Sequence, residues 1–147
     1  MNLKRKTCLL PLLLGLALPA WADGRLSCTD TTEAAKAGSE APANVAFAAE
    51  CRYRGSLAQA YRAWRAHPQY GVGNADYAAA VPRQLPPGNY SRRTAQQAGE
   101  GDLVTLRRQG RHQATLKIES LLNGGYLSAA FRQNGGTVAI RVLAEAP

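Results

Sequence analysis

The sequence predicts an α+β domain in which short N-terminal helices pack on one face of a C-terminal four-stranded antiparallel β-meander, with one disulfide. Three observations predict this class. Gly-containing turn signals separate β-rich runs after Asp102. Two capping boxes mark helix starts in the first half of the chain. Two cysteines, Cys28 and Cys51, follow a segment typical of exported proteins.

The composition is that of one folded domain. The chain has 147 residues, of which 46% are hydrophobic and 19% are charged. This balance excludes a disordered chain, and the length suits one domain over 23–147.

Residues 1–22 have the order of a secretory signal peptide. Basic residues occupy positions 4–6, an apolar run covers 9–18, and Ala20 and Ala22 supply the small residues that a signal peptidase recognises. The apolar run is too short to span a bilayer, so we expect cleavage after Ala22 rather than anchoring. No later segment is long and apolar enough to cross a membrane. We therefore expect a periplasmic or secreted protein with no transmembrane segment in the mature chain.

The two cysteines that remain after cleavage predict a disulfide between Cys28 and Cys51. Cys8 lies in the leader and would leave with it. The competing interpretation is a metal or redox pair, but the spacing is far from Cys-x-x-Cys and no histidine is near in sequence. In an oxidising compartment an isolated pair most simply forms a disulfide.

The segment 23–81 is expected to be helical. Residues 30–33 form a capping box with Asp30 as N-cap, and the short helix that it starts is expected to run to Lys36, with Gly38 as its stop. Residues 45–53 are ambiguous, because apolar positions alternate as in a strand while the alanine content favours helix.

A second capping box, at 56–59, starts a clearer helix. Leu57, Tyr61 and Trp64 fall on one face of it, and Pro68 ends it. Asn74 is expected to cap one more helical turn before Pro82.

The rest of the chain divides into a loop and a sheet. Pro82, Pro86, Pro87 and Gly88 predict a long Pro/Gly-rich loop over 82–101. From 102 to 147 the sequence predicts an antiparallel β-meander with strands over 103–108, 113–121, 126–133 and 137–144.

Alternation along these strands predicts two different faces. The apolar positions share one side: Val104, Leu106, Leu116, Ile118, Leu127, Ala129, Phe131, Val138, Ile140 and Val142. The opposite, solvated side carries Thr105, Arg107, Lys117, Glu119, Arg132 and Arg141. We expect the helix that starts at Leu57 to cover the apolar side.

Few residues offer catalytic chemistry. His67 stands at a helix end, where histidine commonly serves as a C-terminal cap, and His112 follows a hairpin turn. No zinc-protease, hydrolase or phosphate-loop motif is present. We therefore expect no enzyme activity, no metal and no nucleotide or other cofactor. One weak alternative is a small secreted ribonuclease, in which His112, Glu119 and Arg107 would act together.

The basic surface gives a more specific hypothesis. Lys and Arg number 18 against 10 Asp and Glu, for a net charge of +8. Arg107, Lys117, Arg132 and Arg141 are predicted to converge on the solvated sheet face. Arg92 and Arg93, beside Tyr90, are candidates on the Pro-rich loop. Such cations attract anionic partners, and arginine adds forked hydrogen bonds to carboxylates or phosphates.

Three function classes follow from these observations. The first is an exported, non-enzymatic binding protein of the bacterial envelope, of inhibitor or immunity type, that binds an acidic protein through its basic sheet face. The second binds a polyanion such as lipopolysaccharide, acidic polysaccharide or extracellular DNA. The third is the ribonuclease. Salt dependence separates the first two, because polyanion binding weakens steeply with salt.

Overall fold

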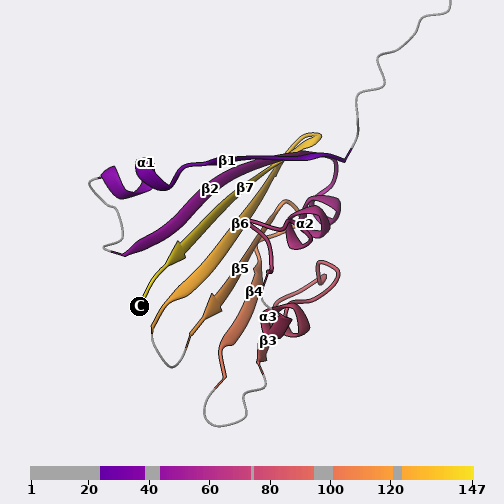
Figure 1. Ribbon diagram of the computed structural model, residues 1–147. Helices are drawn as coiled ribbons and strands as arrows, with labels where there is room; N and C mark the ends of the chain where they lie inside the picture. Colours follow the sequence, from indigo (N-terminus) through magenta and orange to yellow (C-terminus); the bar gives the residue numbers. More distant parts are fainter. Residues whose placement is uncertain (1–23, 39–43, 74, 95–100, 121–123) are drawn as a thin grey trace, which may run out of the picture.

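In the part of the chain that the structure describes, seven strands form one antiparallel sheet, in the order β1-β2-β7-β6-β5-β4-β3 (Figure 1). The computed structural model describes residues 24–38, 44–73, 75–94, 101–120 and 124–147. The strands are β1 (Leu26–Asp30), β2 (Val45–Arg54), β3 (Tyr90–Arg93), β4 (Leu103–Arg108), β5 (Gln113–Glu119), β6 (Tyr126–Asn134) and β7 (Thr137–Glu145). The helices are α1 (Thr32–Ala37), α2 (Leu57–Arg65) and α3 (Ala75–Ala80). The predicted leader, 1–22, and the predicted cap Asn74 lie outside the described residues.

The predicted fold class is wrong, because the first half of the chain is not a helical segment. It contributes two strands, β1 and β2, to the sheet, and its helices are short. β2 forms where alanines favoured helix, and it lies between β1 and β7 with antiparallel pairing to both. β3 forms inside the segment predicted as a loop and pairs with β4. The sheet therefore has seven strands in place of four.

The four C-terminal strands form where the turn signals predict them. Each pairs with the next in the antiparallel sense. Gly110 and Gly135, in two of the connections, have φ of 70° and 56°, a conformation that glycine adopts without steric cost. Of the residues assigned to the apolar side, Leu127 is half-buried and the others are buried.

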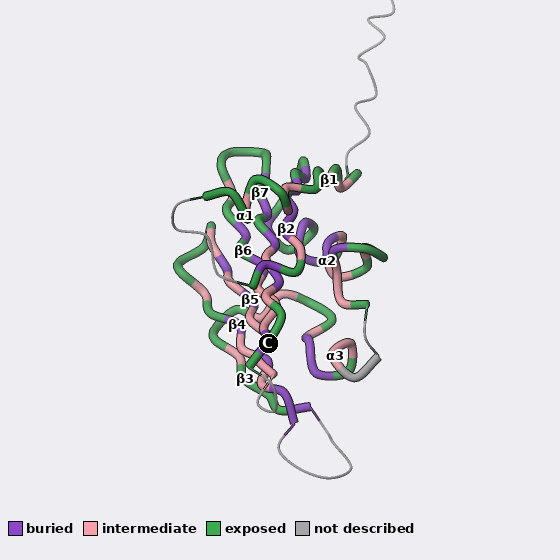
Figure 2. The backbone as a smooth tube through the Cα atoms, turned by 60° about the vertical axis from the view of Figure 1, so that its left-hand side comes forward, coloured by how far each residue is buried: buried purple, intermediate pink, exposed green. Residues whose placement is uncertain are grey.

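The core lies between this side of the sheet and α2. Ser56 and Gln59 form the predicted capping box, with both reciprocal hydrogen bonds present. Tyr61 and Trp64 are fully buried, and the Trp64 ring meets that of Phe131 edge-on, with centroids 5.4 Å apart. Figure 2 shows buried residues along the central strands and on α2, and exposed ones on α1. α2 and α3 thus cover one face of the sheet, and the other face stays open.

The start of α1 differs slightly from the prediction. The helix begins at Thr32, with Thr31 as N-cap and no side-chain hydrogen bond from that cap. Asp30 instead accepts a hydrogen bond from the backbone N–H of Thr32 at 2.8 Å.

The predicted disulfide between Cys28 and Cys51 is confirmed. The two residues are directly opposite each other in β1 and β2, so the bond ties the edge strand to its neighbour. Within the described residues, no helix is both long and apolar enough to cross a membrane.

Candidate functional site

The open face of the sheet carries two neighbouring rows of polar side chains. Strand register fixes each row, because adjacent strands lie about 4.8 Å apart and residues in register share a face. The first row runs across β4, β5, β6, β7 and β2 as Arg107, Thr115, Ala130, Arg141 and Glu50. The second runs across β5, β6, β7 and β2 as Gln113, Arg132, Ala139 and Arg52.

These rows enclose a hollow of about 470 Å³, which we call the sheet hollow. Small residues occupy its middle: Thr115, Ala130 and Ala139. Because these side chains are short and their neighbours are long, the arginines stand around a depression. Arg52, Arg132 and Arg141 line it, together with Glu50 and Gln113.

The charge around the sheet hollow is only partly compensated. Arg141 Nη2 lies 3.4 Å from Glu50 Oε1, but the two side chains are 79% and 57% exposed, so solvent screens this pair. Within the described part of the chain, Arg52, Arg107 and Arg132 form no ion pair. Their guanidinium groups keep their donors available for an anionic partner.

Lys117 lies on the open face as predicted but belongs to a separate polar cluster. Its Nζ is 2.7 Å from Glu119 Oε1 and 4.7 Å from the centre of the Tyr126 ring. The Tyr126 hydroxyl donates a hydrogen bond to Glu145. This bond, together with burial and the Glu145 charge, raises the pKa of Tyr126 to about 12. The lysine charge is therefore largely neutralised within the cluster.

The three residues predicted on the Pro-rich loop divide between the two faces. Register places Arg93 on the open side, opposite Leu103. Tyr90 and Arg92 face the helices: the Tyr90 hydroxyl donates to the Ala80 carbonyl at 2.7 Å, and Arg92 Nη1 donates to the Ala79 carbonyl at 3.5 Å. The predicted group therefore does not form one site.

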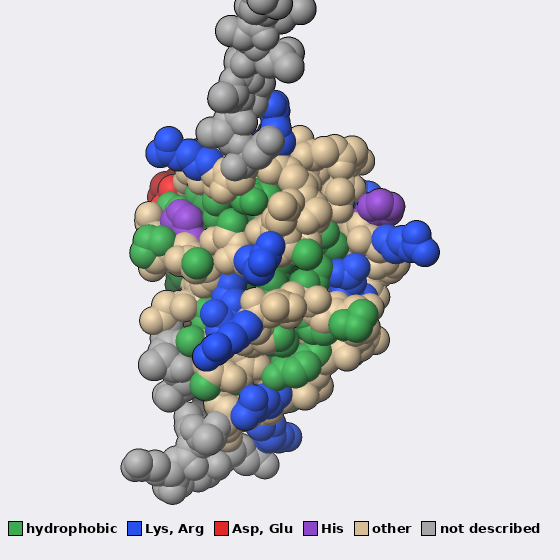
Figure 3. All heavy atoms as spheres, turned by 90° about the vertical axis from the view of Figure 1, so that its right-hand side faces the viewer, with side chains coloured by type: hydrophobic (Ala, Val, Ile, Leu, Met, Phe, Trp, Pro, Cys, Tyr) green, Lys and Arg blue, Asp and Glu red, His purple; other side chains and the backbone are tan. Residues whose placement is uncertain are grey.

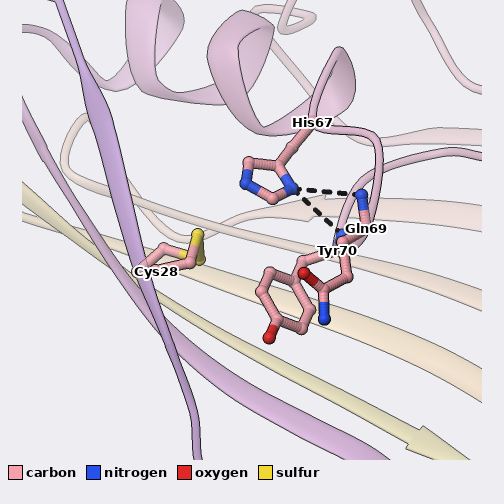
Figure 4. The surroundings of a disulfide bond; sticks show 5 residues. Cys28, His67, Gln69 and Tyr70 are labelled. Atoms are coloured by element: carbon pink, nitrogen blue, oxygen red, sulfur yellow. Dashed lines mark hydrogen bonds between the residues drawn. A yellow bond between two sulfur atoms is a disulfide. The ribbon is translucent and has the colours of Figure 1, made fainter.

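His67 has a structural role that differs from the predicted helix cap. α2 ends at Arg65, and His67 Nδ1 accepts hydrogen bonds from the backbone N–H groups of Gln69 and Tyr70, at 3.3 and 3.1 Å. Its ring stacks on Tyr70 beside the disulfide (Figure 4). His67 therefore stabilises the turn that follows the helix.

The residues of the ribonuclease alternative are not brought together. His112 is exposed just before β5, whereas Glu119 ends that strand, about 23 Å away at the usual strand rise. Glu119 is paired with Lys117. Acid and base catalysis on one phosphate needs both groups within hydrogen-bond reach of it, which this separation prevents.

Arg52 and Glu50 are the site residues that the sequence analysis missed. They come from β2, and only the pairing of β2 with β7 brings them beside Arg141 and Ala139. The alternation of apolar residues in 45–53 was the available signal for this strand.

Searches of protein-family models, curated proteins and solved structures found no match to this chain. In the described residues, no three or more His, Cys, Asp and Glu side chains gather as a metal-binding group.

Proposed function

We propose that this protein is an exported, non-enzymatic binding protein that presents the open face of its sheet to an acidic protein of the bacterial envelope. The observation that carries the proposal is the grouping of Arg52, Arg132 and Arg141 around the sheet hollow, with Arg107 next to Thr115 on the same face. Arginine suits this role because its planar group forms paired hydrogen bonds with carboxylates.

The mixed character of the open face favours a protein over a polyanion. Glu50 lines the sheet hollow, and Glu119 and Glu145 lie on the same face. A polyanion gains less from such a mixed surface than from a uniformly cationic one, whereas a protein can place a cation or an uncharged group beside each carboxylate. Alternating charge also fixes the orientation of a partner. We propose a partner that the protein inhibits or neutralises, in the periplasm or outside the cell.

The disulfide between Cys28 and Cys51 supports the proposal that the protein resides in an oxidising compartment. Disulfides persist in the periplasm and outside the cell and are rare in the cytosol. N-terminal sequencing of the natural product tests export directly: we expect it to begin after Ala22, and a start at Met1 would contradict export.

Charge reversal on the open face tests the binding proposal. Arg107→Glu with Arg132→Glu is the test variant, because both side chains are exposed and without an ion partner in the described chain. Arg62→Glu with Arg111→Glu is the matched control, with the same change of charge at exposed positions elsewhere. Each immobilised protein is exposed to native envelope extract, and captured proteins are identified by mass spectrometry.

We expect the wild type and the control to capture the same acidic protein, and the test variant to lose it while keeping its circular dichroism melt. Equal capture by both variants would contradict the proposal. Binding is then measured between about 50 and 200 mM salt. A protein partner should lose affinity modestly, whereas a loss of about 10³-fold would favour the polyanion alternative.

A further inference from the structure

A second cationic hollow lies on the opposite, helix-covered side of the sheet. It has a volume of about 770 Å³ and lies between the end of α3 and strand β3. Arg65 of α2, Arg83 of the following loop and Arg92 of β3 line it, and Val81 and Tyr90 form part of its wall. We call it the helix-side hollow. Figure 3 shows Lys and Arg side chains gathered down the middle of this side of the molecule.

Two of these arginines are held in place by the end of α3. Arg65 Nη2 donates to the carbonyls of Ala78 and Val81, at 2.6 and 3.3 Å, and Arg92 Nη1 donates to that of Ala79 at 3.5 Å. Carbonyls at a helix end carry partial negative charge and favour such cations. This anchoring orients both guanidinium groups before any ligand arrives, which lowers the entropic cost of binding.

The three arginines also retain unused binding capacity. Each guanidinium has five N–H donors, and the bonds just described use one nitrogen on Arg65 and one on Arg92. Arg83 is exposed and has no hydrogen bond or ion pair in the described chain. Among the described residues that line the hollow there is no carboxylate. Stabilisation of the end of α3 therefore explains neither the position of Arg83 nor the presence of three positive charges around one hollow.

We propose that the helix-side hollow binds a small ligand through a phosphate monoester group. Three arginines from three different elements can each engage a different oxygen of a tetrahedral anion, whereas a carboxylate offers only two oxygens in one plane. The volume lies within the range of small-molecule sites. Pro82 and the Tyr90 ring, both partly exposed, supply apolar surface for the rest of the ligand, as a sugar or similar ring would need. This site is independent of the open face.

Calorimetric titration with glucose 6-phosphate tests the site, with glucose as the uncharged control. The test variant is Arg83→Ala, which leaves both α3 contacts intact, and the matched control is Arg111→Ala at an exposed hairpin position. We expect saturable binding by the wild type and by Arg111→Ala, none with glucose, and a loss of about tenfold or more in Arg83→Ala. The open-face variant Arg107→Glu with Arg132→Glu should bind glucose 6-phosphate close to normally, so the two proposals can fail separately.

The phosphate could come from a free metabolite or from a lipid headgroup. Sedimentation with phosphatidylcholine vesicles, with and without phosphatidic acid, separates these sources, because phosphatidic acid presents a phosphate monoester at a membrane surface. Binding to neither glucose 6-phosphate nor the phosphatidic acid vesicles, at ligand up to about 10 mM, would overturn the proposal. Equal weakening by Arg83→Ala and Arg111→Ala would overturn it too, because it would show attraction to net charge alone.

Discussion

Breaking the disulfide should remove a large part of the stability of the fold. Cys28 and Cys51 are separated by 23 positions in sequence. In the chain-entropy treatment, releasing a loop of this length lowers the free energy of unfolding by about 3.4 kcal/mol at 25 °C. For a domain of this size, that corresponds to a fall in melting temperature on the order of 10 °C. β1 should respond most, because it is an edge strand whose one strand partner in the described chain is β2.

Urea unfolding of the purified protein, followed by the fluorescence of buried Trp64, measures this loss. Three samples are compared: the oxidised wild type, the reduced wild type, and Cys28→Ala with Cys51→Ala. The reduced wild type keeps its side chains, so it isolates the effect of the cross-link from that of packing around Cys51, which is buried.

The expected result is a similar destabilisation of the reduced protein and the double variant. A reduced protein within about 1 kcal/mol of the oxidised one would refute the reasoning, because loop closure would then contribute little. A loss in the double variant alone would assign the effect to packing around the cysteines.

Three further perturbations test the core, a helix cap and the Tyr126 cluster. Trp64→Ala should cost about 3–5 kcal/mol in urea unfolding, because the side chain is fully buried, whereas a loss under about 1 kcal/mol would contradict the packing of α2 on the sheet. Ser56→Ala should cost about 1 kcal/mol by the same assay through loss of its hydrogen bond from Gln59, and Ser56→Asp, which can cap as well, should cost less. Absorbance titration should give Tyr126 a pKa of about 12. Because this pKa is raised in the folded protein, the stability it contributes is present below pH 10 and is lost as the pH rises toward 12. Replacement of Glu145 by Gln should bring the pKa closer to 10, and an unchanged pKa would contradict the role of this hydrogen bond.

The C-terminal half of the fold could be predicted because the residues that determine each strand and turn are close together in the sequence. Each strand is joined to the next by a short turn, and glycines such as Gly110 and Gly135 adopt the positive φ that these turns use. Alternation then fixes which residues face the core, because a shift by one position would turn every side chain over. The capping box of α2 was predictable for the same reason, since all its partners lie within four residues.

The N-terminal strands could not be predicted in this way because their partners are distant in sequence. β2 joins β7, about ninety residues later, and this pairing outweighs the helix preference of Ala48 and Ala49. The register shift between Val45 and Phe47 further weakens the alternation at the start of the strand. β3 has four residues, and only its pairing with β4 distinguishes it from the Pro-rich loop around it.

The same distinction explains which part of the candidate site could be predicted. Arg107, Arg132 and Arg141 belong to the meander, so alternation alone assigns them to one face. The position of Arg52 could not be predicted without knowing that β2 is the neighbour of β7. The orientation of Arg92 could not be predicted without the register of β3 on β4.

The flanking strands β2 and β3 therefore each contribute charged side chains to one of the two cationic sites. β2, next to the edge strand β1, presents alternate side chains to the two faces of the sheet. Cys51 points into the core and is bonded to β1, while Glu50 and Arg52 on either side of it point into the sheet hollow. The cross-link thus constrains the same stretch of backbone that carries these charges. At the other edge, β3 directs Tyr90 and Arg92 toward the end of α3 and forms one wall of the helix-side hollow. Because the two sites lie on opposite faces of the sheet, a ligand can occupy one without obstructing the other.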